Sequence, residues 1–76
     1  MDKFYIELAN YIKDKRIDKR LTQEELAQKL NVNRSTYANW EQGLRKIDVD
    51  TVMKICQILD IDVIDLTVEM KKYLWV

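Results

Sequence analysis

Residues 21–43, with the sequence LTQEELAQKLNVNRSTYANWEQG, decide the fold because they hold two helix starts with one tight turn between them. Thr22 can cap the first helix, and Glu25 three positions later can return the hydrogen bond, which makes a capping box. Asn33 occupies the capping position of the second helix. Asn31 lies at the exit of the first helix, where the backbone must turn left-handed and Asn is tolerated well. We therefore expect helices over about residues 23–30 and 34–42, joined by a short turn.

The same chemistry marks two further helix starts. At each start an apolar residue precedes the capping residue and a second one follows four positions after the cap, so that the pair can clamp the first turn as a hydrophobic staple. The four sets are Leu21 with Leu26 around Thr22, Val32 with Tyr37 around Asn33, Ile47 with Val52 around Asp48, and Ile61 with Leu66 around Asp62. With a first helix over 3–18, the pattern predicts helices over 49–59 and 63–73. The fold class is all-α, with five short helices in a single domain over residues 1–76. The two or three residues between the second and third helices predict a helix-turn-helix over about 22–42.

Apolar residues at helical spacing give each helix an inward face. The expected core residues are Phe4, Leu8, Ile12 and Ile17 in the first helix, Leu26, Ala27 and Leu30 in the second, Tyr37 and Trp40 in the third, and Val52, Ile55, Cys56 and Leu59 in the fourth. Tyr37 and Trp40 could instead stack on single-stranded nucleic acid, but their spacing matches the inward face. Cys56 could be a redox sensor, which would need exposure and a low pKa, but it too falls at a core position.

The composition argues against several kinds of function. With no His and a single Cys, the chain offers no intrachain disulfide, and we expect neither a metal site nor a cofactor. Paired carboxylates in an apolar pocket and a Gly-rich phosphate loop are also missing, and neither Ser35 nor Thr36 has a catalytic partner, so an enzyme is not expected. No apolar run approaches the roughly 20 residues of a membrane span, and no secretory leader opens the chain. We expect a cytoplasmic protein with no small-molecule ligand.

The charges are spread unevenly along a chain whose net charge is zero. Residues 1–46 hold ten Lys or Arg and seven acidic residues, whereas residues 47–76 hold three and six. A basic surplus in one half fits contact with a polyanion, although the same charges could simply be solvated.

The helix over residues 34–42 has an outward face of short or hydrogen-bonding side chains, made by Arg34, Ser35, Ala38 and Asn39. Arg can bond bidentately to guanine and Asn to adenine, and the methyl group of Ala can touch that of thymine. This face therefore predicts base readout in the major groove of double-stranded DNA, with Asn33 at its edge. The donors around it that suit phosphate oxygens are Thr22, Gln23, Gln42, Arg45 and Lys46.

Residues 21–43, followed by DTVMKICQILDI at 50–61, resemble the Cro/cI-type (XRE-like) helix-turn-helix family of repressors, and the resemblance extends over about residues 6 to 68. The family has Gln at the position of Gln23 and Ala at that of Ala27; this chain departs from it with Asn31 and Asp60 where the family usually has Gly. The resemblance implies that Arg34, Ser35 and Asn39 face bases. It also implies that Gln23 grips phosphate while supporting the recognition helix.

The segment IKDKRI at 12–17 resembles the first helix of phage repressors. This resemblance implies a partly buried ion pair between Arg16 and Glu41, which would tie the first helix to the third. The alternative is that both side chains are exposed.

The sequence MKKYLWV at 70–76 carries apolar and aromatic residues that should not remain in water. Because large exposed apolar patches usually mark interfaces, we expect a symmetric homodimer through residues 61–76, with its recognition helices about 34 Å apart on an inverted repeat. The predicted interface residues are Ile61, Ile64, Tyr73, Leu74, Trp75 and Val76. The segment could also fold back on its own core, or bind a different protein, as in an antitoxin that also binds DNA. The favoured function is that of a transcriptional regulator.

Overall fold

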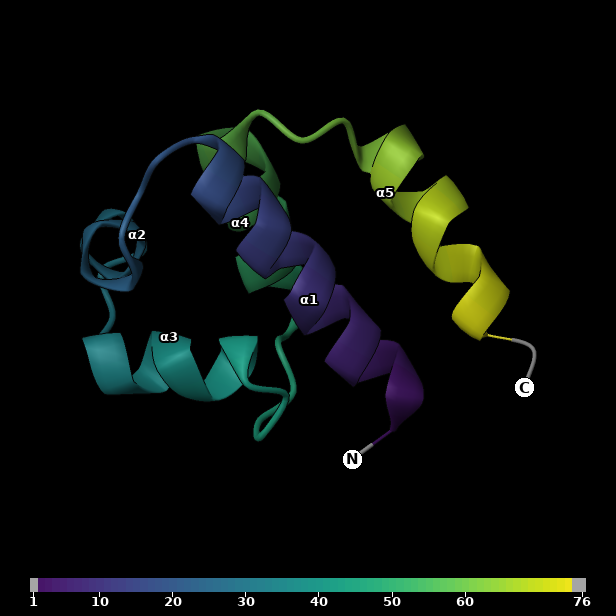
Figure 1. Cartoon of the computed structure of the whole chain (residues 1–76), viewed down its shortest axis with the longest axis horizontal. Helices are drawn as coiled ribbons and strands as arrows, with labels where there is room; N and C mark the ends of the chain where they lie inside the picture. The colour runs from purple at the N-terminus through teal and green to yellow at the C-terminus, as the bar shows by residue number, and fades with distance from the viewer. Residues whose placement is uncertain (1, 75–76) are drawn as a thin grey trace.

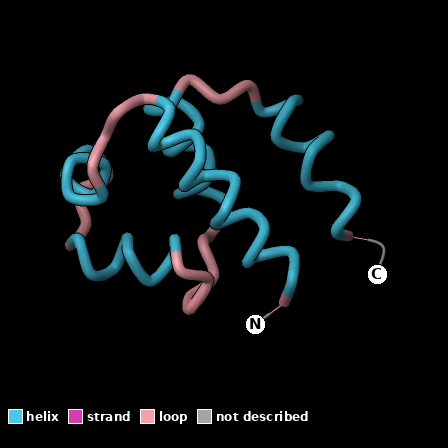
Figure 2. Tube along the Cα trace, in the orientation of Figure 1, coloured by secondary structure: helices cyan, strands magenta, loops and turns pink. Residues whose placement is uncertain are grey.

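The computed structural model describes residues 2–74, which form helices joined by turns and contain no strand (Figure 2). The helices in chain order are α1 (Lys3–Asp18), α2 (Gln23–Lys29), α3 (Arg34–Glu41), α4 (Val49–Leu59) and α5 (Val63–Met70). A 3₁₀ turn, η1 (Lys71–Tyr73), follows α5, so the chain tightens where the sequence predicted a continuous α-helix to residue 73. The predicted all-α class and the order of five helices are confirmed.

The central element of the fold is α1, which contacts α3, α4 and α5. In Figure 1, α1 crosses the middle of the molecule, α2 and α3 lie on one side of it, α4 lies behind it, and α5 lies on the other side. The short turn after α2 brings α2 and α3 together at a steep angle (Figure 1). As a result, α3 forms one edge of the molecule, and the loop from α3 to α4 continues that edge.

Side chains cap four of the five helix starts. Thr22 and Glu25 form the predicted capping box, with hydrogen bonds of 3.0 and 2.8 Å. Asp48 accepts from the backbone N–H of Thr51, Asp62 from that of Ile64, and Asp2, which was not predicted, from that of Phe4. Asn33 has the backbone conformation of a cap but makes no capping hydrogen bond, so its predicted capping role is wrong. The staple residues Val32 and Tyr37 pack in or against the core, and this packing fixes the start of α3 without the bond.

Four helices end in the same way, with a left-handed residue followed by an apolar one. The left-handed residues are Arg20 at φ 58°, Asn31 at 58°, Gly43 at 73° and Asp60 at 56°. In each case the next residue donates its N–H to the carbonyl five positions back, as Ile61 does to Cys56 at 2.8 Å, which is the pattern of a Schellman motif. Asn31 and Asp60 were predicted as such exits; Arg20 was not, because Arg has no preference for this conformation.

One core is shared by all five helices, and it contains or contacts every predicted core residue except Ile17. Leu26 and Ile55 are fully buried, and Cys56 is buried, so that desolvation raises the pKa of its thiol. Ile17 was predicted to point inward but is 52% exposed, and Arg16 occupies the inward position beside it. The first helix therefore carries a buried cation where its apolar pattern suggested a fourth aliphatic side chain. Among residues 2–74, no helix is long and apolar enough to cross a membrane.

Candidate nucleic-acid interface

The two faces of α3 have different environments. Tyr37 is 1% exposed, and Trp40 is half-buried with its ring edge-on to that of Tyr37 at 6.4 Å between centroids. On the outward side, Arg34, Ser35 and Asn39 are exposed and Ala38 is half-buried, while Asn33 is exposed just before the helix. The face predicted to read bases is thus open to solvent, and the face predicted to be core is packed.

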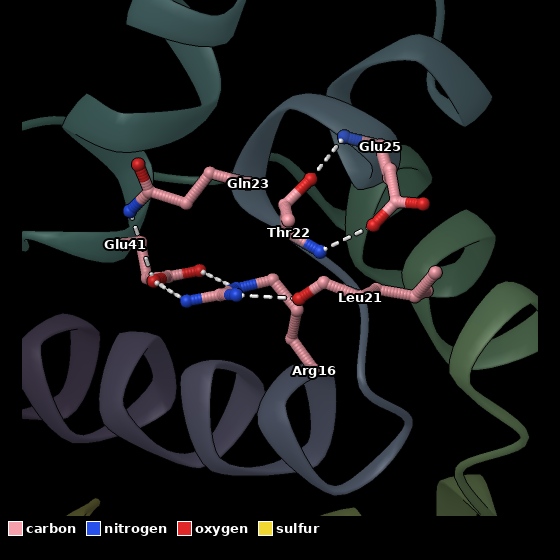
Figure 3. A network of polar contacts seen from close by, with 6 residues as sticks. All are labelled: Arg16, Leu21, Thr22, Gln23, Glu25 and Glu41. Atoms are coloured by element: carbon pink, nitrogen blue, oxygen red, sulfur yellow. Dashed lines mark hydrogen bonds and ion pairs between the residues drawn. The ribbon is translucent and has the colours of Figure 1, made fainter.

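A buried ion pair anchors the end of α3 to α1 (Figure 3). The guanidinium of Arg16 donates from Nε and Nη2 to the two carboxylate oxygens of Glu41, at 2.9 Å each, in a bidentate arrangement. Its third nitrogen, Nη1, donates to the backbone carbonyl of Leu21 at 2.6 Å. The side chains of Arg16 and Glu41 are 11% and 2% exposed, so the ion pair implied by the family resemblance is confirmed.

Gln23 joins this network from the first turn of α2. Its side-chain amide donates to Oε1 of Glu41 at 3.1 Å (Figure 3). The carboxylate of Glu41 therefore links α1, α2 and α3, and Gln23 supports α3 as the resemblance implied. The amide group of Gln has a second N–H, which this bond leaves free.

The electrostatics of the network follow from its burial and its hydrogen bonds. Desolvation opposes the ionisation of Glu41, but the hydrogen bonds from Arg16 and Gln23 outweigh it and hold the pKa of the carboxyl below its usual value. The hydrogen bonds to Glu41 raise the pKa of Arg16. Burial, reinforced by the nearby carboxylate of Glu41, raises the pKa of Tyr37, whose hydroxyl has no hydrogen-bond partner among residues 2–74. All three groups keep their neutral-pH charge states, so the network is stable near neutral pH.

The predicted phosphate donors come from the start of α2 and from the segment after α3, and Gln23 lies beside the last residue of α3. Thr22 at the start of α2 is exposed, and its hydroxyl oxygen accepts the capping bond, which leaves its O–H free to donate. Gln42, Arg45 and Lys46 are exposed after α3, in the segment that contains Gly43. Gly43 has a positive φ and packs against the backbone of α1 at Ile6, so the loop leaves α3 in one defined direction. The ammonium group of Lys46 sits 5.0 Å from the ring centre of Tyr5, which places it at the α1 side of the loop.

Several surface residues next to α3 were not predicted. Gln28, Asn31 and Thr36 line an open hollow with Val32 and Asn33 beside the start of α3. Their amides and hydroxyl were visible in the sequence, but only the geometry of the turn brings them to one place. Leu44, 68% exposed in the loop after α3, was also missed because nothing in the sequence distinguishes it from a core residue.

The basic residues of the first half of the chain do not all lie beside α3. Arg34, Arg45 and Lys46 are on or just after α3, whereas Lys19 is near the far end of α1, 3.9 Å from Asp60 at the corner between α4 and α5. In Figure 1 this corner and α3 lie on opposite sides of the molecule.

The predicted dimer residues fall into three groups. Ile61 is 8% exposed and belongs to the core, so its placement in an interface is wrong: as the apolar residue after the left-handed Asp60, it is buried with Leu66. Tyr73 is half-buried against the core, whereas Ile64 and Leu74 are 71% and 61% exposed. Trp75 and Val76 lie outside the described residues.

The part of the chain that the structure describes has no group of three or more Asp, Glu, Cys or His positioned to hold a metal ion. Together, the angled α2–α3 pair, the open face of α3 and the flanking donors define a helix-turn-helix domain.

Comparison with known proteins agrees with this class. A helix-turn-helix family model matches residues 12–66, and the chain belongs to this XRE-type family of DNA-binding transcriptional regulators. Over 50 residues it is 40% identical to the uncharacterized HTH-type transcriptional regulator YqaE of Bacillus subtilis (strain 168), a match that covers 66% of this chain and 43% of YqaE. The chain thus spans less than half the length of this relative.

The fold is also similar to a solved structure. The crystal structure of the clp gene regulator ClgR from Corynebacterium glutamicum superimposes with a TM-score of 0.81 at 23% sequence identity, covering 91% of this chain and 73% of that one. At this identity the likeness supports the arrangement of the helices.

Proposed function

We propose that this chain binds double-stranded DNA sequence-specifically, as a homodimer on an inverted-repeat operator, and so regulates transcription as a repressor or controller. Membership of a family of DNA-binding regulators supports the class of activity. The observation that carries the proposal is that the outward face of α3 is open while Tyr37 and the Arg16–Glu41 pair hold its inward side. A rigidly held helix with a short, hydrogen-bonding outer face can approach base edges closely.

The side chains divide into readers and clamps. Arg34, Ser35 and Asn39 would read bases, with Ala38 and Asn33 at the edge of the contact. Donors at the start of α2 and after α3 would hold phosphate oxygens and fix the register on the duplex: Thr22, Gln23, Gln42, Arg45 and Lys46. The free O–H of Thr22 and the second amide N–H of Gln23 support this role, since the network within the domain leaves both available.

The proposed dimer would form through the outward face of α5. Ile64 and Val68, one helical turn apart, are 71% and 64% exposed, and Leu74 beyond the helix is 61% exposed. Such a stripe is typical of a helix that packs against another surface. In a twofold-symmetric dimer with its axis at α5, this stripe would pack against the identical stripe of the second copy. A different protein partner on the same stripe, as in an antitoxin, is the alternative that the test must distinguish.

Selection of binding sites from a pool of random duplexes tests the proposal. We expect two inverted half-sites whose centres are about 10 base pairs apart, one turn of the duplex. Light scattering of the isolated protein should give the mass of a dimer, and Ile64→Asp should reduce it to that of a monomer that still contacts a half-site. Enrichment of no sequence would contradict base readout. A monomeric wild-type protein would contradict the dimer and favour a heterologous partner for α5.

A further inference from the structure

The start of α1 lies beside the loop that follows α3. A methyl group added to Gly43 of this loop would lie 3.2 Å from the side chain of Ile6, so the loop packs closely against α1. The ammonium group of Lys46, further along the same loop, lies 5.0 Å from the ring centre of Tyr5. In Figure 1 the start of α1 and this loop lie at the same edge of the molecule as α3. The first turn of α1 is therefore next to the surface that would face DNA, although the proposed readers and clamps include none of its residues.

We propose that Tyr5 is a positioning residue, which holds the side chain of Lys46 ready to contact a phosphate of the DNA backbone. An aromatic ring attracts an ammonium group over its face but covers it from one side only, so N–H donors remain free for a phosphate oxygen. None of the ion pairs among residues 2–74 involves Lys46, whereas Lys54 and Lys72 are each paired with an acidic side chain. The positive charge of Lys46 is thus available to an external anion. The inference rests on the proposed DNA binding and adds the residue that orders one of its phosphate contacts.

Both members of the pair are attached to fixed parts of the fold. Asp2 caps α1 by accepting the backbone N–H of Phe4 at 3.0 Å, and Phe4 packs against the core. The rings of Phe4 and Tyr5 are edge-on, with 5.4 Å between their centres, so the core also sets the orientation of Tyr5. On the other side, Ile47 is 7% exposed and anchors the backbone next to Lys46. The ammonium group is therefore held at one place beside α1 by contacts at both ends of the pair.

The contribution of Tyr5 to binding follows from the flexibility of lysine. A free lysine side chain loses much conformational entropy when a phosphate immobilises it, and a side chain that is already ordered loses less. A cation–π pair at an exposed site is worth a factor of about two to five in an equilibrium constant. Because phosphate contacts carry no sequence information, the gain should be the same for operator and random duplexes. Tyr5 would thus raise the affinity without changing the sequence preference.

A double-mutant cycle on DNA affinity tests the inference. Tyr5→Leu should weaken binding to operator and random duplexes alike by about two- to fivefold, measured by fluorescence anisotropy at one salt concentration. In the Lys46→Ala background the same substitution should have no further effect. Tyr5→Phe keeps an aromatic ring and should bind as wild type does. Tyr11→Leu is the matched control: it removes the equivalent pair with Lys15, at 5.4 Å, from the side of α1 that borders α5, and should leave the affinity unchanged.

The proton chemical shifts of Lys46 give a second reading that does not involve DNA. The ε-methylene protons of Lys46 should be shifted upfield by the ring current in the wild-type protein and in Tyr5→Phe, and this shift should disappear in Tyr5→Leu. Circular dichroism checks that the variants are folded. Tyr5 is half-buried and outside the core cluster, so the fold should tolerate its replacement.

The outcomes separate this inference from the proposed function. A wild-type protein that binds no duplex would refute both. If the wild-type protein binds, any one of four results would overturn the inference alone: wild-type affinity of Tyr5→Leu, additive losses in the double variant, a loss in Tyr5→Phe equal to that in Tyr5→Leu, or absence of the ring-current shift.

Discussion

Removing the cation of the buried ion pair should strongly destabilise the domain. Arg16→Met keeps a long apolar stem but leaves the carboxylate of Glu41, 2% exposed, with only the hydrogen bond from Gln23. Breaking one partner of a buried pair costs about 3–5 kcal/mol, because the remaining charge stays desolvated. A chain of 76 residues has a total stability of roughly 4–11 kcal/mol, so the variant should lose about a quarter of it or more.

Urea unfolding followed by circular dichroism at pH 7 measures this loss. With a slope of about 1 kcal/mol per molar urea for a small domain, the midpoint should fall by about 3 M or more. Lys54→Met is the matched control, since it breaks the ion pair with Asp50 at 3.1 Å on the surface of α4, where the two side chains are 59% and 74% exposed. A surface pair of this spacing contributes about 0.3–0.5 kcal/mol, so this control should remain near wild type.

A double variant separates the stranded charge from lost packing. Arg16→Met with Glu41→Leu leaves no charge behind, and apolar replacements of buried pairs are often neutral or stabilising. We expect it to unfold within about 2 kcal/mol of wild type, the remainder reflecting the Leu21 carbonyl that loses its donor. If Arg16→Met alone stayed within about 1 kcal/mol of wild type, the pair would not be buried in solution. A double variant as unstable as the single one would show that packing, and not the stranded charge, accounts for the loss.

Further predictions concern DNA binding, pH and the backbone. Arg34→Ala should weaken specific binding by about 1–3 kcal/mol and relax the preference at one base pair. Lys46→Ala should instead weaken binding to specific and random duplexes alike and lower the slope of log affinity against log salt by about one. Fluorescence anisotropy across salt concentrations measures both effects, and identical behaviour of the two variants would refute the division into readers and clamps. Because folding lowers the pKa of Glu41, the stabilisation that its carboxylate provides is complete above the ordinary glutamate pKa of roughly 4.3. This stabilisation is lost as the pH falls through the folded-state pKa. The urea midpoint should therefore fall as the pH drops below roughly 4.3, and it should fall less steeply in Glu41→Gln. Part of the slope should persist in that variant, since capping lowers the pKa of Glu25 and of Asp48 as well. Gly43→Ala should lower the free energy of unfolding by more than about 1 kcal/mol, and with it the thermal midpoint, because φ is 73° and Ile6 lies 3.2 Å from the new methyl group. Asn31→Gly, at φ 58°, should leave the thermal midpoint unchanged or raise it.

The helix boundaries could be predicted from the sequence because local chemistry fixes them. Capping side chains, hydrophobic staples and left-handed helix exits depend on contacts within a few residues. The roles of Thr22, Asp48 and Asp60 could therefore be predicted from the neighbouring sequence alone. The outward face of α3 was predictable for the same reason, since the helical period alone separates Tyr37 from Asn39. The exit at Arg20 was missed because its conformation is imposed by the packing of Leu21 after it, and a residue without a preference carries no signal.

What could not be predicted depends on contacts between distant residues. The periodicity of α1 favoured Ile17 as a core residue, but the inward position belongs to Arg16, whose carboxylate partner is 25 residues away. Only the resemblance to phage repressors pointed to this pair. The hydrophobic pattern of a helix predicts that a charged residue is exposed, so it cannot identify a buried cation. Ile61 was assigned to an interface for a related reason: an apolar residue has the same sequence signal whether it is covered by its own core or by another subunit.

The buried pair also bears on how α3 can face a polyanion. Glu41 is the only acidic residue of α3, and exposed at the DNA side its charge would repel phosphate. Burial against Arg16 makes the pair neutral as a unit, while charge-assisted hydrogen bonds in a fixed bidentate geometry hold the helix more directionally than apolar contact can. The Arg16→Met, Glu41→Leu double variant tests this effect, because it removes both charges and is expected to keep the fold. We expect it to bind random duplexes as wild type does but to discriminate less between operator and mismatched sites, since α3 loses its fixed angle. Full discrimination by a stable double variant would mean that apolar packing around Tyr37 suffices to orient the helix.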